Sequence, residues 1–316
     1  MFVTCYARQT MYTIKQAAQR TGIAIPTIRV WERRYGVVAP TRTPAGYRLY
    51  DDDSIARLRA MQHLVDLEGW RPSQAADRIR AADLAELADL GGPSARPAVA
   101  DASGVGQEAP EAIDAIVDSA RDLDVAAMER TLDETFAGQR FESAMDVVVF
   151  PALRKIGEAW AGGELDVARE HAASETVRRR IAHFFDAAAR TAAGRTVVVG
   201  LPPGSHHELG AFAFAVAARR AGLGVLYLGA DVPLDAWQRT VRDADPAAVV
   251  LAVVSRGDVG PASDVIRALG GEGRRVVAVG GPAAPEVEAA LGAVLLPDRI
   301  DEAVMTLLEV AGPAAS

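Results

Sequence analysis

The residues with the clearest capacity for metal chemistry are two adjacent histidines, His206 and His207, in the loop Leu201–Gly210. An imidazole nitrogen can bind a transition metal while a neighbouring group orients the second ring nitrogen. The loop follows TVVVGL, an apolar run of the length expected for a buried strand. Ligands of open parallel sheets bind at the carboxyl ends of the strands. The position therefore favours a ligand site, although a loop histidine taken alone is more often an ordinary polar residue.

Small residues follow two further strand-like runs. Ser255 comes after AAVVLAVV, and Gly280 and Gly281 end RVVAVGG. With VLYLGA and GAVLLP there are five apolar runs, each separated from the next by a helical stretch. The pattern predicts a doubly wound, flavodoxin-like α/β domain with a five-stranded parallel sheet over residues 194–316. Serine and glycine at the strand ends would let a ligand pass close to the backbone.

The preceding segment, residues 111–193, has apolar residues at three- and four-residue spacing and predicts a four-helix bundle. Trp160 lies at the end of the third helix, and nine residues separate it from the pair Glu170-His171. Taken alone, Trp160 is a core aromatic residue and the Glu-His pair is part of a solvated helix face. The expected helices cover residues 111–120, 124–138, 141–161 and 164–190.

Three consecutive arginines, Arg178–Arg180, lie on the fourth helix of the predicted bundle. A run of this kind is usually a solvated face. The alternative is that the run pairs with acidic residues across an interface between two copies of the chain.

Residues 11–90 predict a winged helix-turn-helix. Thr13 and Gln16 form a capping box for a short helix that ends at Gly22, and Pro26 suits the first turn of the next helix. The second helix is basic, and its arginines at four-residue spacing share a face that fits a major groove. The expected DNA contacts are Thr27, Arg29 and Arg33 on this helix, and Arg42, Tyr47 and Arg48 in a hairpin wing that turns at Pro44-Ala45-Gly46.

The net charge of the chain is −8, but the charges are unevenly distributed. Residues 11–60 hold nine Lys and Arg against four acids, a local net charge of +5. A basic end on an acidic chain is the asymmetry expected when one end meets phosphates. The charge pattern and the helix-turn-helix together predict double-stranded DNA as a partner.

Residues 91–110 are rich in Gly, Pro, Ser and Ala and predict a flexible linker between the DNA-binding head and the rest of the chain. Cys5 is the only cysteine, which excludes an internal disulfide and fits a reducing cytoplasm. No apolar run approaches the roughly 18 residues that suggest a membrane span. A cytoplasmic protein without membrane contact is expected.

The head closely resembles the MerR family of DNA-binding regulators. Residues 12–80 contain the patterns I-x-x-x-A-x-x-x-G-I, T-I-R-x-W-E and G-Y-R-x-Y that members of that family share. The resemblance implies operator DNA as the partner. The linker begins where the long dimerisation helix of the family should run, so oligomerisation is expected to lie in the body.

The loop after the first strand resembles the D/E-x-H-x-x-G motif of cobalamin-binding domains. His207 and Gly210 match the motif, and the resemblance implies that His207 is the lower ligand of cobalt in place of the cofactor's own base. Ser255, Gly280 and Gly281 match the remaining pieces of the pattern, beside the buried nucleotide tail.

One departure concerns the acid position of this motif, which is Ser205 here. The acid normally accepts the second ring N–H of the histidine and so strengthens the metal bond. Ser205 would accept that hydrogen bond as a neutral group, or Glu208 would substitute for the acid.

The spacing of Trp160 and Glu170-His171 resembles the CarH/LitR photoreceptors, MerR-type regulators that bind adenosylcobalamin. The order of head, linker, four-helix cap and cobalamin domain is also the order in that family. The resemblance implies that Trp160 caps the adenosyl group, that Glu170 contacts it, and that His171 becomes the upper cobalt ligand after light breaks the Co–C bond. It further implies a repressor that is a homo-oligomer, a tetramer in the dark, and that releases operator DNA in the light.

Two alternatives remain at this point. The same regulator could bind another tetrapyrrole, such as a bilin, or act without a cofactor, because Ser205 replaces the usual acid. The second is a corrinoid methyl carrier, since a helical cap joined to a cobalamin domain also occurs in methyltransferases. The DNA-binding head and the Trp160 spacing argue against a carrier, and an enzyme is not expected.

Overall fold

The computed structural model describes residues 10–43, 46–67, 70, 72–82, 86–87, 108–188, 196–269 and 276–311. Its chain divides into two compact units, Met1–Ala187 and Ala188–Ser316. Residues 91–107 of the predicted linker, and Pro44 and Ala45 of the predicted wing turn, lie outside the described residues. Within the described part, none of the helices is both long and apolar enough to span a bilayer.

The first unit begins with the predicted winged helix-turn-helix. A short strand, β1 (Tyr12–Thr13), leads into α1 (Ile14–Thr21), and α2 (Ile25–Val30) continues as a π-helical turn over Trp31–Tyr35. The expected capping box is present, because the Gln16 N–H donates to the Thr13 hydroxyl and the Thr13 N–H donates to the Gln16 side chain. Gly22 ends α1 with a φ of 73°, a conformation that glycine adopts without strain.

The wing is a small antiparallel sheet in the strand order β1-β3-β2, in which β2 is Thr41–Arg42 and β3 is Arg48–Tyr50. Helices α3 (Asp52–Gln62) and α4 (Pro72–Ala81) complete the head. Large side chains of these elements form one core, in which the exposed fraction of Trp31 is 3% and that of Tyr50 is 0%.

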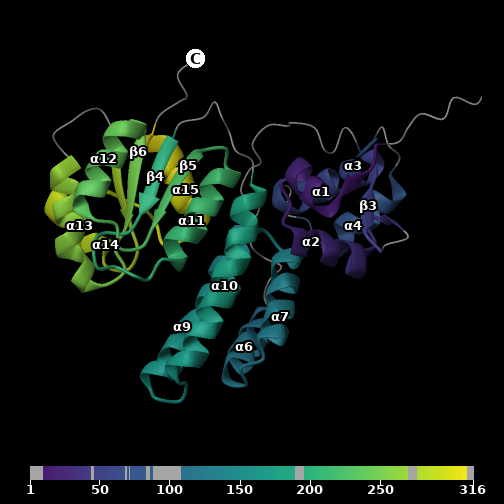
Figure 1. The fold of residues 1–316 in the computed structure, drawn as a ribbon, viewed down its shortest axis with the longest axis horizontal. Coiled ribbons are helices and arrows are strands. Elements are labelled where there is room, and N and C mark those ends of the chain that lie inside the picture. The colour runs from purple at the N-terminus through teal and green to yellow at the C-terminus, as the bar shows by residue number, and fades with distance from the viewer. Residues whose placement is uncertain are drawn as a thin grey trace, which may run out of the picture. The chain divides into compact units, whose positions relative to one another are not determined.

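The rest of the first unit is the helical bundle, formed by α6 (Glu108–Arg121), α7 (Val125–Gly138), α8 (Phe141–Ala144), α9 (Phe150–Ala161) and α10 (Val167–Ala187). A π-helical turn, Met145–Val149, joins α8 to α9 into one rod, as the sequence predicts. Phe136, Phe141 and Phe184 meet in the core with ring centroids 4.8 to 5.7 Å apart. Figure 1 shows α9 and α10 lying side by side, with α6 and α7 beside them.

Head and bundle are in contact within this unit. Helix α2 packs against α7, the indole N–H of Trp31 donates to the Ala137 carbonyl at 3.0 Å, and Ala137 joins the core of the head. Arg33 lies 3.8 Å from Glu134 on the same face of α7. The second helix of the helix-turn-helix therefore lies against the bundle in this arrangement.

The second unit is the predicted five-stranded parallel sheet, in the order β5-β4-β6-β7-β8. The strands are mainly apolar, and the exposed fraction of Val197, Val198 and Val199 in β4 is 0%, as expected for a parallel strand covered on both faces. The edge strand β5 is only partly buried. Helices α11 and α15 cover one face and α12, α13 and α14 the other (Figure 1). The strands are β4 (Thr196–Gly200), β5 (Gly224–Gly229), β6 (Ala248–Ala252), β7 (Val276–Gly280) and β8 (Val294–Leu295), and the helices are α11 (Leu209–Arg220), α12 (Leu234–Ala244), α13 (Arg256–Leu269), α14 (Ala284–Leu291) and α15 (Ile300–Val310).

The strand order fixes where a ligand can enter. The chain runs from β4 outward to β5 and then returns past β4 to β6. The connection after β4 therefore leads toward one edge of the sheet, and the connection after its neighbour β6 leads toward the other edge. This divergence is the topological switch point, where doubly wound sheets bind their ligands. The loop that contains His207 starts at this point, directly after β4.

Candidate functional site

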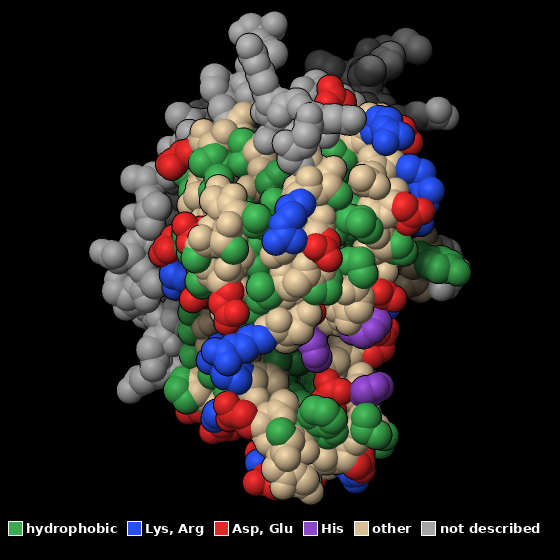
Figure 2. Space-filling view, turned by 90° about the vertical axis from the view of Figure 1, so that its left-hand side faces the viewer, with side chains coloured by type: hydrophobic (Ala, Val, Ile, Leu, Met, Phe, Trp, Pro, Cys, Tyr) green, Lys and Arg blue, Asp and Glu red, His purple; other side chains and the backbone are tan. Residues whose placement is uncertain are grey.

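The loop after β4 is held in place by the end of β5. The Gly204 N–H donates to the Asp231 carboxylate at 2.7 Å, and the Asp231 N–H donates to the Ser205 carbonyl at 2.9 Å. Ser205 is buried with 2% exposure, whereas His206 and His207 are exposed. Figure 2 shows histidine side chains on the surface of the molecule. The loop thus has a fixed base and presents two imidazoles to a ligand.

The residues that follow the histidines begin α11. Glu208 is the N-cap residue of α11, and its carboxylate accepts the Tyr227 hydroxyl at 3.0 Å. Gly210 lies in the first turn of the helix, and a Cβ built there would meet no atom within 4 Å. The packing of this chain therefore does not require glycine at position 210, and the space beside it is open to a ligand.

The second strand end at the switch point belongs to β6. Ser255 is exposed, and the buried carboxylate of Asp258 accepts the N–H groups of Val254 at 3.1 Å and of Ser255 at 2.8 Å. Burial raises the pKa of Asp258, but the hydrogen bonds from the backbone N–H groups of Ser255 and Val254, together with the nearby hydroxyls of Ser255 and Ser205, outweigh it, so the pKa is lowered overall. Asp258 therefore favours its ionised form, and the Ser205 hydroxyl of the loop after β4 lies near it.

The double glycine after β7 has a reason within the protein itself. A Cβ at Gly281 would lie 2.7 Å from the Val253 carbonyl oxygen, and the residue has a φ of +107°. The Val253 N–H donates to the Gly280 carbonyl at 2.8 Å, so the backbones of the two loops are in contact. Gly281 is therefore required for this backbone contact, whether or not a ligand tail passes nearby.

At the far end of the bundle, the last turn of α9 and the first turn of α10 carry the Trp-Glu-His set. The exposed fraction of Trp160 is 50%, so this residue is not a core aromatic in the described structure. His171 Nδ1 lies 2.6 Å from the Glu170 carboxylate, whose other oxygen accepts the Ser174 hydroxyl at 2.7 Å. The ring of His171 is thereby oriented with its Nε2 atom available to a metal.

The connection between α9 and α10 is tied to the bundle. The Asp166 carboxylate caps α10 by accepting the Arg169 N–H at 2.9 Å, and this hydrogen bond lowers the pKa of Asp166. Arg169 in turn donates to the Arg121 carbonyl at the end of α6. The sequence pattern predicted that this helix begins at residue 164, but α10 begins at Val167. The cap at Asp166 explains the later start.

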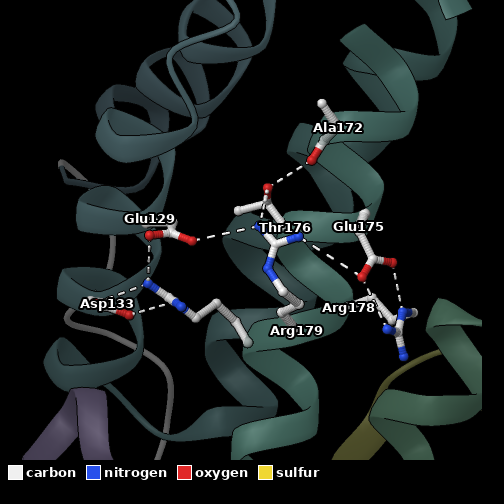
Figure 3. Close-up of polar contacts among 8 residues, drawn as sticks. Glu129, Asp133, Ala172, Glu175, Thr176, Arg178 and Arg179 are labelled. Atoms are coloured by element: carbon white, nitrogen blue, oxygen red, sulfur yellow. Dashed lines mark hydrogen bonds and ion pairs between the residues drawn. The ribbon is translucent and has the colours of Figure 1, made fainter. Parts of the chain in front are cut away.

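The arginine run on α10 pairs with acids of its own bundle. Arg180 is only 12% exposed and lies 2.8 Å from Asp133 on α7, and Arg179 lies 3.6 Å from Glu129 on the same helix. Arg178 pairs with Glu175 one turn earlier on α10 at 2.7 Å, as Figure 3 shows. Pairing with a second copy is not needed to explain the run.

The predicted DNA-contact residues of the head differ in exposure. Arg29 and Arg42 are exposed, and so is Tyr47, whose exposed fraction is 71%. Arg48 donates to Glu32 at 2.9 Å, so its guanidinium already has a partner within the head. Thr27 is 4% exposed on a helix that packs against α7, and contact between Thr27 and DNA would require α2 to leave α7.

The candidate ligand residues fall into two groups on separate units. His207, Ser205, Ser255 and the glycines belong to Ala188–Ser316, and the bundle set belongs to Met1–Ala187. No cluster of three or more His, Cys, Asp or Glu gathers among the described residues, so that part of the chain offers no all-protein metal cage. A metal that is carried by a macrocycle and bound through one imidazole would fit this donor set.

Two residues of the loop framework were not predicted from the sequence. Asp231 has no motif that marks it. Asp258 follows Ser255 by three residues at the start of a helix, a spacing that is common in helix caps and indicates no ligand by itself. Its proximity to Ser205 depends on the sheet order, which brings residues 53 positions apart to the ends of two neighbouring strands.

Family models match three stretches of the chain. Residues 12–82 match "MerR HTH family regulatory protein", and residues 112–184 and 195–301 match two different models described as "B12 binding domain". The first match supports DNA binding by the head. The other two cover the bundle and the sheet and support cobalamin as the cofactor.

Similar proteins include two regulators of Myxococcus xanthus. The HTH-type transcriptional repressor CarH is 35% identical over 77% of this chain and 79% of that protein. The HTH-type transcriptional repressor CarA is 31% identical over 76% of each chain. A solved structure, the monomethylamine corrinoid protein of Methanosarcina barkeri, matches 64% of this chain and 99% of its own chain. The TM-score is 0.55 and the sequence identity 17%, so the match shows a shared fold. The chain thus belongs to the CarH family of MerR-type transcriptional regulators with B12-binding domains, a family of regulators and not of enzymes.

Proposed function

We propose that this protein is a light-responsive transcriptional repressor that uses adenosylcobalamin to control its assembly on DNA. The observation that carries the proposal is the exposed, oriented set of Trp160, Glu170 and His171 at one end of a B12-type bundle. A carrier of methyl groups has no need of a DNA-binding head, and this chain has both in one polypeptide. Bound adenosylcobalamin would supply a Co–C bond that light can break.

The residues after β4 fit the lower face of the cofactor. His207 is exposed at the switch point, and Gly210 leaves open space beside it that a larger residue would fill. Ser205, two residues before His207, has a buried hydroxyl oxygen that makes no hydrogen bond of normal geometry. A ring N–H from His207 would satisfy that oxygen once the other ring nitrogen binds cobalt.

The bundle residues fit the upper face. Trp160 presents a half-exposed indole on which a flat adenine can stack. Glu170 offers a carboxylate oxygen to hydroxyl or amino groups, and its hydrogen bond to Nδ1 directs the Nε2 atom of His171 outward. We infer that Trp160 and Glu170 hold the adenosyl group in the dark, and that His171 binds cobalt after the group has left.

The body would convert this chemistry into DNA affinity through the number of heads it brings together. A single winged helix-turn-helix with few base contacts binds weakly, and joining several heads in a homo-oligomer, a dark tetramer, raises the overall affinity without new contacts. Arg29, Arg42 and Tyr47 are exposed and are proposed DNA contacts, as is Arg33, which is exposed but lies 3.8 Å from Glu134. Thr27 and Arg48 are contacts that would require rearrangement. Loss of the adenosyl group would break the oligomer and release the DNA.

The test is to load the full chain with adenosylcobalamin in the dark and to record the visible spectrum and the size-exclusion profile before and after green light. We expect the corrinoid to remain with the protein, and the dark oligomer to fall to a smaller species on illumination. Recovery of the chain without corrinoid would contradict the cofactor assignment. A bound corrinoid with no change of oligomer would contradict the light switch and leave another role for the cofactor.

A further inference from the structure

Asp258 is a buried charge close to the proposed lower ligand. Only 6% of its surface is exposed. The N–H groups of Val254 and Ser255, four and three residues earlier in the chain, both donate to one oxygen of its carboxylate. Burying an ionised carboxylate is unfavourable unless hydrogen bonds compensate for the lost water. The backbone N–H groups after β6 therefore stabilise a buried negative charge at the switch point of the sheet.

Ser205 follows β4, the strand that pairs with β6 beside this carboxylate. Ser205 is 2% exposed, and its hydroxyl oxygen makes no hydrogen bond of normal geometry. The same hydroxyl contributes to the lowered pKa of Asp258. A serine hydroxyl has one hydrogen to donate and two lone pairs that accept. Ser205 can therefore donate to a carboxylate and at the same time accept a ring N–H.

We propose that Asp258 is the positioning residue for His207 and acts through Ser205. The Ser205 hydroxyl would donate to Asp258 and accept the N–H of the His207 ring whose other nitrogen binds cobalt. In the D/E-x-H motif the carboxylate lies directly beside the histidine. In this chain the carboxylate would lie at the end of the neighbouring strand and would act on the histidine through the Ser205 hydroxyl. The inference rests on the proposed ligation of cobalt by His207.

Glu208 is the competing source of a negative charge, since it adjoins His207 in the sequence. Its carboxylate accepts the Tyr227 hydroxyl at 3.0 Å, and the same oxygen lies 3.5 Å from the position of a Cβ on Gly229. Both partners belong to β5, on the side of β4 away from β6. Glu208 is thus directed toward β5, whereas Ser205 follows β4 and Asp258 follows β6, the neighbouring strand on the opposite side of β4.

The experiment uses the full chain loaded with cob(II)alamin, whose paramagnetic resonance spectrum reports the axial nitrogen. The protein is labelled with ¹⁵N-histidine. If a protein imidazole binds cobalt, each cobalt line is split into a doublet in place of the triplet that ¹⁴N gives. If the cofactor's own base binds cobalt, the triplet remains. The variants are Asp258→Asn, which keeps the shape and removes the charge, and Ser205→Ala, which leaves the hydrogen bonds of Asp258 to the backbone intact. The matched control is Asp264→Asn, an exposed carboxylate on the same helix.

We expect both test variants to lose about tenfold or more in the ratio of imidazole-bound to unbound cobalt, the size typical of lost outer-shell partners of a metal ligand. The control should match the wild type. The double variant Ser205→Asp with Asp258→Asn should restore the doublet, because it places an acid directly beside the ring. A purely structural role of Asp258 as a turn cap would give no such rescue.

Two results would overturn the inference, and they are distinguishable. A wild-type spectrum without the doublet would remove the His207 ligation on which the relay depends. A wild-type doublet that persists unchanged in Ser205→Ala and Asp258→Asn, with circular dichroism showing folded protein, would contradict the relay and leave the ligation intact.

Discussion

His206 and His207 are the same residue type in adjacent positions, and both are exposed. They differ in their spacing from Ser205 and Gly210. The Asp231 N–H holds the Ser205 carbonyl, and Ser205 is buried, so its hydroxyl is a fixed acceptor for an imidazole two residues along the loop. The D/E-x-H-x-x-G spacing selects His207, and the structure adds a buried, unsatisfied hydroxyl two residues before it.

The prediction for these residues compares His207→Ala with its neighbour. In His207→Ala, cobalamin should bind at least about tenfold more weakly, because the metal loses its protein ligand and the cofactor must keep its own base. His206→Ala is the matched control and should bind as the wild type does. Equilibrium dialysis with cobalamin in the dark gives both affinities. Equal affinities for the two variants, or a larger loss in His206→Ala, would show that the ligand has been assigned to the wrong imidazole.

The elements were more predictable than the contacts between them. Apolar runs and capping residues in the sequence predicted the five strands, the capping box at Thr13 and the long third helix of the bundle, and the structure has all of them. The proposed substitute for the missing acid could not be predicted, because only the sheet order brings Asp258 near Ser205. The packing of α2 against α7 was equally hidden, since it depends on the surfaces of two helices that are each amphipathic.

At the level of the bundle, the Arg180–Asp133 pair predicts a measurable contribution to stability. Arg180 is 12% and Asp133 24% exposed, and burial already raises the pKa of Asp133, so removing its partner leaves a poorly solvated carboxylate. Arg180→Ala should lower the free energy of unfolding of the bundle by about 1–3 kcal/mol. Arg178→Ala, which breaks an exposed pair, should cost at most about 1 kcal/mol. Hydrogen exchange of α7 and α10 measures both, and equal protection in the two variants would count against the argument.

A pH-dependent prediction concerns the start of α3 in the head. The Asp51 carboxylate caps this helix by accepting the Ser54 N–H at 2.8 Å and the Ser54 hydroxyl at 2.7 Å. Burial raises the pKa of Asp51, but these hydrogen bonds outweigh it and lower the pKa overall. A lowered pKa in the folded state means that the stabilisation is complete above the unfolded value of about 3.9 and is lost as pH falls through the folded value.

Asp51→Ala should therefore lower the free energy of unfolding of the head by about 1 kcal/mol at neutral pH. The difference from the wild type should shrink once the pH falls below about 3.9. Asp77→Ala, an exposed acid on α4 that pairs with Arg80, is the control and should show little effect at either pH. Urea unfolding followed by circular dichroism gives the values, and a difference that grows as the pH falls would refute the assignment.

The molecule as a whole joins a MerR-type DNA-binding head to a body with B12-binding domains in one chain. The basic residues 11–60 supply the attraction for phosphates, and the acidic remainder of the chain keeps non-specific binding by the body low. The affinity of an assembly with several heads exceeds that of one head by about 100-fold or more when the heads bind together. Under the proposed mechanism, control of assembly would therefore be sufficient to control repression.

The most direct test of this central claim is the affinity for a DNA site selected from random sequence by the dark, adenosylcobalamin-loaded chain. Fluorescence anisotropy at one fixed salt concentration should show the dissociation constant rising by about 100-fold after green light, as expected when joined heads separate. Chain loaded with hydroxocobalamin, which has no adenosyl group to lose, should bind weakly in the dark and not respond to light. Equal affinities before and after illumination of the adenosylcobalamin-loaded chain would contradict the account.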